Sequence, residues 1–120
     1  MTLIEVAIYA LVLANPGPAL CRLGEPARVT CSNGLAADIL SVGAARFNNG
    51  VTVRRDDDGF PVFSNGITSR LSNGWLRFSN GVGVRRVALS RYDFDNGISC
   101  RAELPELVDC ARHAADPGGG

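Results

Sequence analysis

The four cysteines are the residues whose type and spacing most directly suggest chemistry. They form two pairs of equal spacing, Cys21 with Cys31 and Cys100 with Cys110. Thiolates at short spacings bind zinc, but this chain has no Cys-x-x-Cys motif and a single histidine. The pattern therefore favours disulfide bonds over free buried thiols or a metal site, and it leaves the connectivity open. Disulfides in a small chain indicate an oxidising compartment, which is extracellular or at the cell surface, with the periplasm as the alternative.

The acidic residues and the histidine form no catalytic arrangement. Asp56–Gly59 places three aspartates at a turn, but this run lacks the alternating spacing and distal glutamate of an EF-hand loop. No pattern among Glu103, Glu106 and Asp109 singles out an acid and a base, and no motif places a nucleophile beside His113. Nucleotide-binding, zinc-protease and serine-hydrolase motifs are absent from the sequence. We expect no catalytic residues, no metal and no cofactor, so the protein is predicted not to be an enzyme.

Arginine supplies every basic side chain, and the twelve arginines are balanced by twelve acidic residues. A net charge of zero gives no long-range attraction to nucleic acid, so no nucleic-acid partner is expected. Arginines recur after successive turns, near the single tryptophan. Such a face binds polyanions or glycans, although a solvated face that balances nearby aspartates has the same pattern. The candidate ligand face comprises Arg54, Arg70, Trp75, Arg77, Arg85 and Arg101.

A repeated five-residue unit indicates the elements that must position these residues. An apolar residue is followed by Ser or another small polar residue, then Asn, Gly and a second apolar residue, with units starting at positions 31, 47, 63, 71, 78 and 94. Asn-Gly between apolar runs is the strongest local signal for a β-hairpin. Three-residue loops would pair the flanking residues across the strands, as in Phe47/Val51, Phe63/Ile67, Phe78/Val82 and Phe94/Ile98. The predicted turn residues are Asn33, Gly34, Asn49, Gly50, Asn65, Gly66, Asn73, Gly74, Asn80, Gly81, Asn96 and Gly97.

This spacing predicts a mainly β fold, an antiparallel β-meander of repeated x-Asn-Gly hairpins, with a short apolar N-terminal segment and one short C-terminal helix. The stretch from Ala19 is predicted to be irregular until the first strand. Strands are predicted near 28–31, 35–41, 44–47, 51–56, 60–63, 67–71, 75–78, 82–90, 92–94 and 98–102. Whether the sheet stays open or closes is not decided by the pattern.

The C-terminal part departs from the repeat. Leu104, Leu107, Val108 and Ala111 follow helical spacing, and Pro105 suits the first turn of a helix over about 105–115. The predicted organisation is therefore an N-terminal segment over 1–18, a hairpin-repeat domain over 19–104, and a C-terminal helix with a glycine tail over 105–120.

Residues 2–14 are apolar apart from Thr2 and Glu5. This run is too short to span a bilayer as a helix, and Asn15-Pro16-Gly17-Pro18 ends any regular element. The segment has the composition of a cleaved signal peptide, an assembly helix, a β-strand donated to a neighbouring subunit, or an ordinary core element.

The start of the chain, Met1-Thr2-Leu3-Ile4-Glu5-Val6, resembles the mature N-terminus of type IV pilins and pseudopilins. The resemblance covers only residues 1–14. It implies that Met1 is N-methylated, that the apolar helix packs in the core of a filament, and that Glu5 pairs with the terminal amine of a neighbouring subunit. A buried carboxylate needs such a charge partner, because leaving it unpaired in apolar surroundings is costly.

The first functional hypothesis is a structural subunit of an extracellular, pilus-like filament. Met1 and Glu5 would mediate polymerisation of the protein with itself, and residues 1–14 would contact a membrane only before assembly. The alternative is a secreted or periplasmic β-repeat binding module whose signal peptide is removed. A weaker alternative is a virion accessory protein.

Overall fold

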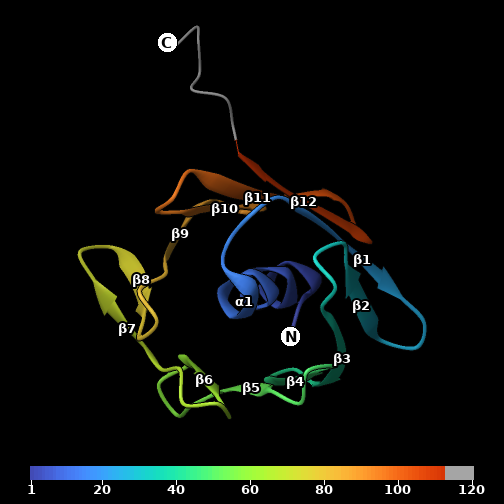
Figure 1. The fold of residues 1–120 in the computed structure, drawn as a ribbon, viewed down its shortest axis with the longest axis horizontal. Coiled ribbons are helices and arrows are strands. Elements are labelled where there is room, and N and C mark those ends of the chain that lie inside the picture. Colours follow the sequence, from blue (N-terminus) through green and yellow to red (C-terminus); the bar gives the residue numbers. More distant parts are fainter. Residues whose placement is uncertain (113–120) are drawn as a thin grey trace, which may run out of the picture.

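The computed structural model describes residues 1–112 and shows a sheet of antiparallel strands wrapped around one helix, α1 (Leu3–Ala14) (Figure 1). The prediction of a mainly β, antiparallel fold is confirmed. In order, the strands are β1 (Ala19–Gly24), β2 (Arg28–Cys31), β3 (Ala36–Ser41), β4 (Ala44–Phe47), β5 (Thr52–Arg55), β6 (Pro61–Phe63), β7 (Ser69–Ser72), β8 (Trp75–Phe78), β9 (Gly83–Ala88), β10 (Arg91–Phe94), β11 (Ile98–Leu104) and β12 (Leu107–Arg112).

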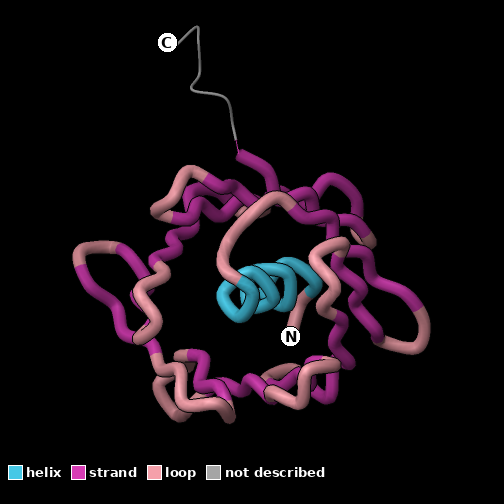
Figure 2. Tube along the Cα trace, in the orientation of Figure 1, coloured by secondary structure: helices cyan, strands magenta, loops and turns pink. Residues whose placement is uncertain are grey.

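All twelve strands belong to one nearly closed sheet, with the order β6-β5-β4-β3-β2-β1-β12-β11-β10-β9-β8-β7. The chain is therefore a meander in two arms, which meet where the first strand, β1, pairs with the last, β12. The two outermost strands, β6 and β7, are consecutive in sequence and do not pair. Figure 2 shows the resulting ring of strands with the helix inside it. We call the unpaired boundary between β6 and β7 the seam.

Two disulfide bonds lie on either side of the β1–β12 junction, as the cysteine pattern indicated. Cys21 bonds to Cys31 across β1 and β2, and Cys100 bonds to Cys110 across β11 and β12. In each case the two residues stand directly opposite one another, so the strand register itself selects the pairing. A disulfide that closes a short loop stabilises a fold by about 2–4 kcal/mol. These bonds thus reinforce the place where the two ends of the meander join.

The helix fills the interior of the sheet. Its N-terminus carries a capping box, in which Thr2 accepts a hydrogen bond from the Glu5 amide and the Glu5 carboxylate accepts one from the Thr2 amide. Val6, Leu11 and Val12 are fully buried. A helix that is apolar around most of its circumference is stable only where it is surrounded. Of the open interpretations of residues 2–14, the structure shows a helix inside its own sheet.

The helix does not lie equally close to all strands. It packs most closely against β1, β2, β11 and β12, the four strands that carry the disulfides. Small side chains face it there, including Ala19, Cys21 and Val108. The phenylalanines that precede the turns, Phe47, Phe63, Phe78 and Phe94, fill the interior elsewhere. The helix therefore lies off-centre, toward the β1–β12 junction.

Five Asn-Gly turns gather at one end of the sheet, which we call the Asn-Gly end. They are the three-residue loops at 32–34, 48–50, 64–66, 79–81 and 95–97. In each loop the Asn side chain accepts a hydrogen bond from the amide two residues ahead, and the Gly has a φ between 89° and 99°. Asparagine and glycine are thus required for two different reasons, an Asx-turn and a left-handed backbone.

The first residue of each of these loops connects one hairpin to the preceding one. The Ser32 amide donates to the Leu20 carbonyl, and the Ser32 hydroxyl accepts from the Leu20 amide at 2.9 Å. Asn48, Ser64 and Ser79 make the same pair of contacts with Ala36, Thr52 and Thr68. The short polar side chain at this position therefore extends the pairing between neighbouring strands beyond the end of the ladder.

The unit Leu71–Trp75 differs from the other five. Ser72 pairs directly with Trp75, and Asn73 and Gly74 have φ values of 53° and 82°. These features define a two-residue loop of type I′ rather than a three-residue loop. The loop lies at the end of the sheet opposite to the Asn-Gly end. The spacing between repeated units is shorter around position 71, because the turn at Asn73-Gly74 lies at the opposite end of the strands from the turns before and after it.

Two predictions at the ends of the meander were wrong. The stretch after Ala19 forms β1 rather than an irregular segment, and residues 107–112 form β12 rather than part of a C-terminal helix. Pro105 and Glu106 form the turn between β11 and β12. Val108 and Cys110 both point into the core, two residues apart, as in a β-strand. Because Cys110 must lie opposite Cys100, the strand forms despite the helical spacing of the apolar residues. Residues 113–120, which include the end of the predicted helix and the glycine tail, lie outside the described part.

Deletion of residues 1–14 is expected to abolish cooperative folding of the remaining chain. Each buried aliphatic side chain of α1 stabilises the fold by about 1.5–3 kcal/mol, so the set matches the whole stability of a small domain. Thermal unfolding followed by circular dichroism checks this, and a synthetic peptide of residues 1–14 added in trans should restore the transition. A truncated chain that unfolds cooperatively by itself would show that the sheet does not need the helix.

Replacement of Gly66 by Ala should lower the free energy of unfolding by about 1–2 kcal/mol, because Gly66 has a φ of 99°. Gly43 provides the matched control. It also lies in a turn with open space around it, but its φ is not positive, so Gly43→Ala should be neutral. Denaturant titration of both variants measures the difference, and equal stabilities would contradict the assigned loop geometry.

Candidate ligand-binding cleft

The predicted assembly residues, Met1 and Glu5, make contacts within their own chain. The Glu5 carboxylate forms an ion pair with Arg55 on β5, and the Met1 amino group donates a hydrogen bond to the Ser41 carbonyl at 2.6 Å. Burial, and then the positive charge of Arg55, lowers the pKa of the Met1 amino group. The filament hypothesis remains a prediction, and it requires α1 to leave the sheet that encloses it here.

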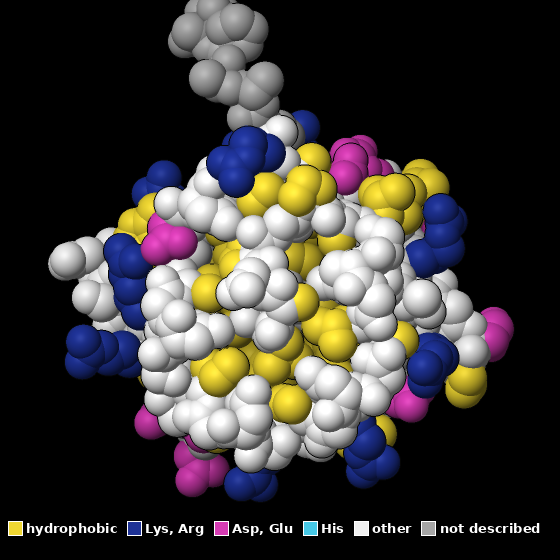
Figure 3. Space-filling view, viewed as in Figure 1, with side chains coloured by type: hydrophobic (Ala, Val, Ile, Leu, Met, Phe, Trp, Pro, Cys, Tyr) yellow, Lys and Arg dark blue, Asp and Glu magenta, His cyan; other side chains and the backbone are white. Residues whose placement is uncertain are grey.

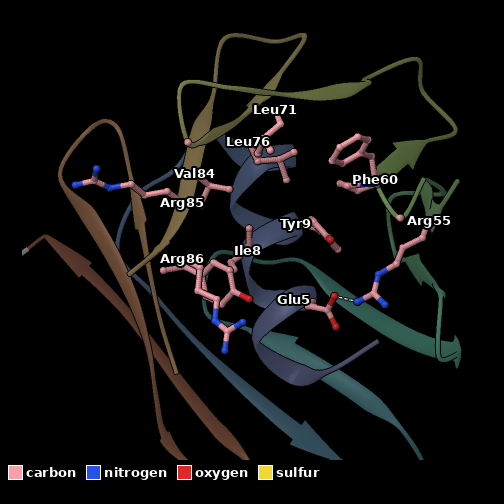
Figure 4. A pocket seen from close by; sticks show the side chains of 14 residues that line it. Glu5, Ile8, Tyr9, Arg55, Phe60, Leu71, Leu76, Val84, Arg85 and Arg86 are labelled. Atoms are coloured by element: carbon pink, nitrogen blue, oxygen red, sulfur yellow. Dashed lines mark ion pairs between the residues drawn. The ribbon is translucent and has the colours of Figure 1, made fainter. Parts of the chain in front are cut away.

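A cleft of about 510 Å³ lies between α1 and the sheet on the side of the seam. Because the helix packs toward the disulfide-bonded strands, this opposite side is left incompletely filled. The cleft reaches from β5 and β6 across the seam to β7–β10. Its walls are formed by Glu5, Ile8, Tyr9, Arg55, Gly59, Phe60, Pro61, Leu71, Gly74, Leu76, Val84, Arg85, Arg86 and Tyr92 (Figure 4).

The local sequence explains why the sheet is not closed at the seam. Pro61 begins β6 and has no backbone N–H to donate, which suits an edge strand. The Ser69 hydroxyl donates to the Pro61 carbonyl at 3.0 Å, and the Phe63 amide donates to the Ile67 carbonyl at the base of the loop that joins the two strands. Beneath it, Phe63 packs edge-on against both Tyr9 and Phe78, with ring centroids 5.7 and 5.9 Å apart. Side chains, more than backbone pairing, therefore hold the seam together.

Tyr9 is the polar group inside the cleft. Its side chain is directed from α1 into the space between the helix and β6 (Figure 4), and the residue is only 6% exposed. No described residue forms a hydrogen bond with its hydroxyl, and the hydroxyl oxygen is not one of the fully enclosed polar atoms, so it is open to the cleft. Burial, with a smaller contribution from Tyr92, raises the pKa of Tyr9 to about 12. The phenol therefore stays protonated at neutral pH and can donate a hydrogen bond to a molecule in the cleft.

The mouth of the cleft is charged. Glu5 is already occupied by Arg55 and by the Thr2 amide and hydroxyl, both 2.9 Å from its carboxylate. The remaining cations there, Arg85 and Arg86, come from neighbouring positions on β9 and point to different sides of the sheet (Figure 4). Arg86 donates one hydrogen bond, from Nε to the Ala88 carbonyl at 3.2 Å. The site thus combines apolar walls, the unpaired hydroxyl of the buried Tyr9 side chain and a cationic mouth.

The predicted ligand face is only partly assembled. Arg77 and Arg85 lie over the ring of Trp75, with guanidinium carbons 5.5 and 4.6 Å from the ring centroid, and Arg70 stands opposite Arg77. Arg54 lies on β5, beyond the seam, and Arg101 lies on β11. The structure therefore brings four of the six residues together on the outside of β7–β9 and separates the other two from them.

Acidic residues neutralise much of this outer surface. Arg77 forms an ion pair with Asp95 at 2.9 Å, and this pair passes over Gly83, where any side chain would collide with both partners. Burial tends to raise the pKa of Asp93, but hydrogen bonds from Ser99 and Arg91 outweigh it, so that the pKa lies below its usual value. These ion pairs agree with the reading of the arginines as a charge-balanced, solvated face. Around the exterior, charged side chains are spread over the circumference (Figure 3).

The other sequence candidates have structural roles or lie outside the described residues. Asp56 caps its own turn, because its carboxylate accepts hydrogen bonds from the Asp58 and Phe60 amides. Within residues 1–112 no group of three or more potential metal ligands is found. Two turn asparagines hold the end of the helix, since Asn80 donates to the Val12 carbonyl and Asn96 to the Pro16 carbonyl. His113 is not among the described residues.

Comparisons of this chain with protein-family models, with curated proteins and with solved structures gave no significant match. No helix in the described part of the chain is long and apolar enough to cross a membrane. The residues of the cleft must therefore be interpreted from their own geometry.

Sequence reasoning missed the cleft and its central residue. Tyr9 lies within an apolar run, where a tyrosine signals only a buried aromatic ring. The one available signal was that its hydroxyl would need a partner in a helix without other polar side chains beyond Glu5. Arg86 and Tyr92 are neighbours through the pairing of β9 with β10, but Phe60 reaches the same cleft only because the sheet curls, and spacing in the sequence does not reveal this.

Ionisation of Tyr9 gives a direct test of its environment. In a Tyr92→Phe variant, Tyr9 is the remaining tyrosine, and because burial is the larger cause of its raised pKa, its phenol should still ionise well above pH 10 in the folded protein and near pH 10 after unfolding. Because the folded state has the higher pKa, its contribution to stability is complete below about pH 10 and is lost as the pH rises to about 12, a change of about 2–3 kcal/mol. Ultraviolet titration of phenolate measures both values. Ionisation near pH 10 in the folded variant would show that the hydroxyl is not shielded by the cleft.

Proposed function

We propose that this protein is a binding module of an oxidising, extracellular or periplasmic compartment, which holds a small, largely apolar molecule in the cleft between α1 and the seam. The observation that carries the proposal is the Tyr9 hydroxyl, which is protonated, has no hydrogen-bond partner among the described residues and is directed from a buried side chain into the cleft. A donor that the protein leaves unpaired and open to a mostly apolar cleft favours a site where a ligand supplies the acceptor.

The dimensions and lining of the cleft support the same conclusion. Sites for small molecules have volumes of roughly 300–1,000 Å³, mostly apolar walls and a few oriented polar groups. Here the walls come from Ile8 on the helix, Phe60 in the turn before β6, and Leu76 and Val84 on the sheet. Leu71, which is 63% exposed, forms part of the outer lip. An apolar molecule that enters would cover this lip and replace water along the walls.

The scaffold is suited to hold such a site in place. The disulfides fix the strands that support α1, and the ion pair between Glu5 and Arg55 fixes the first turn of the helix against β5. Tyr9 lies one turn further along the helix, so the same contact orients its side chain. A binding group on a rigid element loses little conformational freedom when a ligand arrives.

Binding of a neutral, environment-sensitive fluorophore such as N-phenylnaphthylamine tests this function. Its fluorescence should rise on addition of the protein, and Leu71→Ser should weaken the affinity about fivefold, since about 1 kcal/mol of apolar contact is lost at the lip. Leu40→Ser is the matched control, because Leu40 is also exposed, at 48%, but does not line the cleft. Equal affinities for the two variants, or no binding by the parent protein, would refute the proposed site.

A further inference from the structure

The charges around the cleft carry information about the ligand that its apolar walls do not. Three arginines and one glutamate line it. Glu5 forms its ion pair with Arg55, so this arginine is neutralised within the protein. Of the other two, Arg85 lies against the outer ring of Trp75 and points away from the cleft (Figure 4). Arg86 remains as the cation that faces the mouth.

Arg86 has no acidic partner among the described residues, and the ion pairs nearby involve other arginines. Its Nε is held by the Ala88 carbonyl, which orients the guanidinium and leaves the terminal nitrogens available. Tyr92 stands directly opposite Arg86 in the pairing of β9 with β10 and also lines the cleft. An exposed guanidinium next to an apolar wall is a common arrangement for binding a carboxylate or phosphate.

We infer that the ligand of the cleft is an amphiphile with one anionic head group, which binds Arg86 while the apolar body lies along Ile8, Leu76 and Val84. This inference rests on the proposed function and adds the chemical class of the ligand. The Tyr9 hydroxyl then donates a hydrogen bond to an acceptor further along the ligand, and the charge at the mouth sets the orientation in which the amphiphile enters. Opposite charges in a partly desolvated site attract more strongly than in bulk water.

Two sources present this chemistry, a dissolved amphiphile and an anionic lipid in a bilayer. The cleft favours the dissolved form, because its apolar walls come from α1 and from strands on both sides of the seam, so that a ligand would lie between the helix and the sheet. Vesicles that contain phosphatidylglycerol therefore should not sediment the protein. Sedimentation with these vesicles, combined with no binding of a dissolved amphiphile, would overturn the assignment to a soluble ligand.

The experiment compares decanoate with decanol by displacement of N-phenylnaphthylamine from the full-length protein. Decanoate should bind about tenfold more tightly than decanol at neutral pH and moderate salt. Arg86→Gln should reduce this preference to about twofold, because it weakens the binding of decanoate much more than that of decanol, and Arg86→Lys should retain most of the preference. Arg54→Gln is the matched control, since Arg54 is an exposed arginine outside the cleft and this variant should keep the full preference.

The outcomes separate the two proposals. Equal binding of decanoate and decanol, or a preference that survives in Arg86→Gln, would overturn the anionic head group and leave the binding module intact. If neither compound displaces the fluorophore and the fluorophore itself does not bind, both proposals fail. The preference should also decline as the pH is lowered through the carboxylate pKa, between about 4 and 5, because the neutral acid has no charge to pair.

Discussion

The packing of one apolar helix against one face of a curled sheet is the interaction on which this structure depends. Strands of three to seven residues cannot bury their inner faces against each other across so wide a ring, and α1 supplies the missing apolar surface. In return, the sheet provides the surroundings that a helix with few polar side chains requires in water. Neither element has an independent core, so folding must bring them together.

The position of the helix inside the sheet determines where the cleft lies. Cysteine, alanine and valine on the strands near the β1–β12 junction let the helix approach closely, and the disulfides keep these strands in register. Displacement of the helix toward one side leaves space on the other. The same side contains the seam, where Pro61 and the short edge strands prevent closure. The cleft is thus a consequence of packing and pairing rather than of a dedicated loop.

Much of the sheet could be predicted from the sequence because its information is local. An Asn-Gly pair with a preceding polar residue specifies a turn within a few residues, including the left-handed glycine and the contact of the polar residue with the preceding hairpin. The strands between such turns could therefore be located. The pairing of β1 with β12 joins residues nearly the whole chain apart, and no repeated unit marks either strand. Only the spacing of the cysteines pointed to them. The cleft could not be predicted for a similar reason, because the curvature of the sheet brings residues such as Tyr9, Pro61 and Leu71 to one side of the helix.

The residues behind the pilin resemblance have another physical role here, since Thr2 and Glu5 form a capping box and Glu5 pairs with Arg55.

The hydrogen bonds between successive hairpins at the Asn-Gly end make each hairpin a repeated module of the sheet. A hairpin of about sixteen residues carries its own turn and its own connection to the hairpin before it, so neighbouring modules do not depend on the identity of those further along. Gain or loss of one module would change the circumference of the sheet while the disulfide-bonded junction and the helix stayed in place. We therefore expect the width of the seam to depend on the number of hairpin modules in the sheet. A lineage that duplicated or deleted a hairpin would widen or close the cleft in a single genetic step, without substituting any residue that lines it.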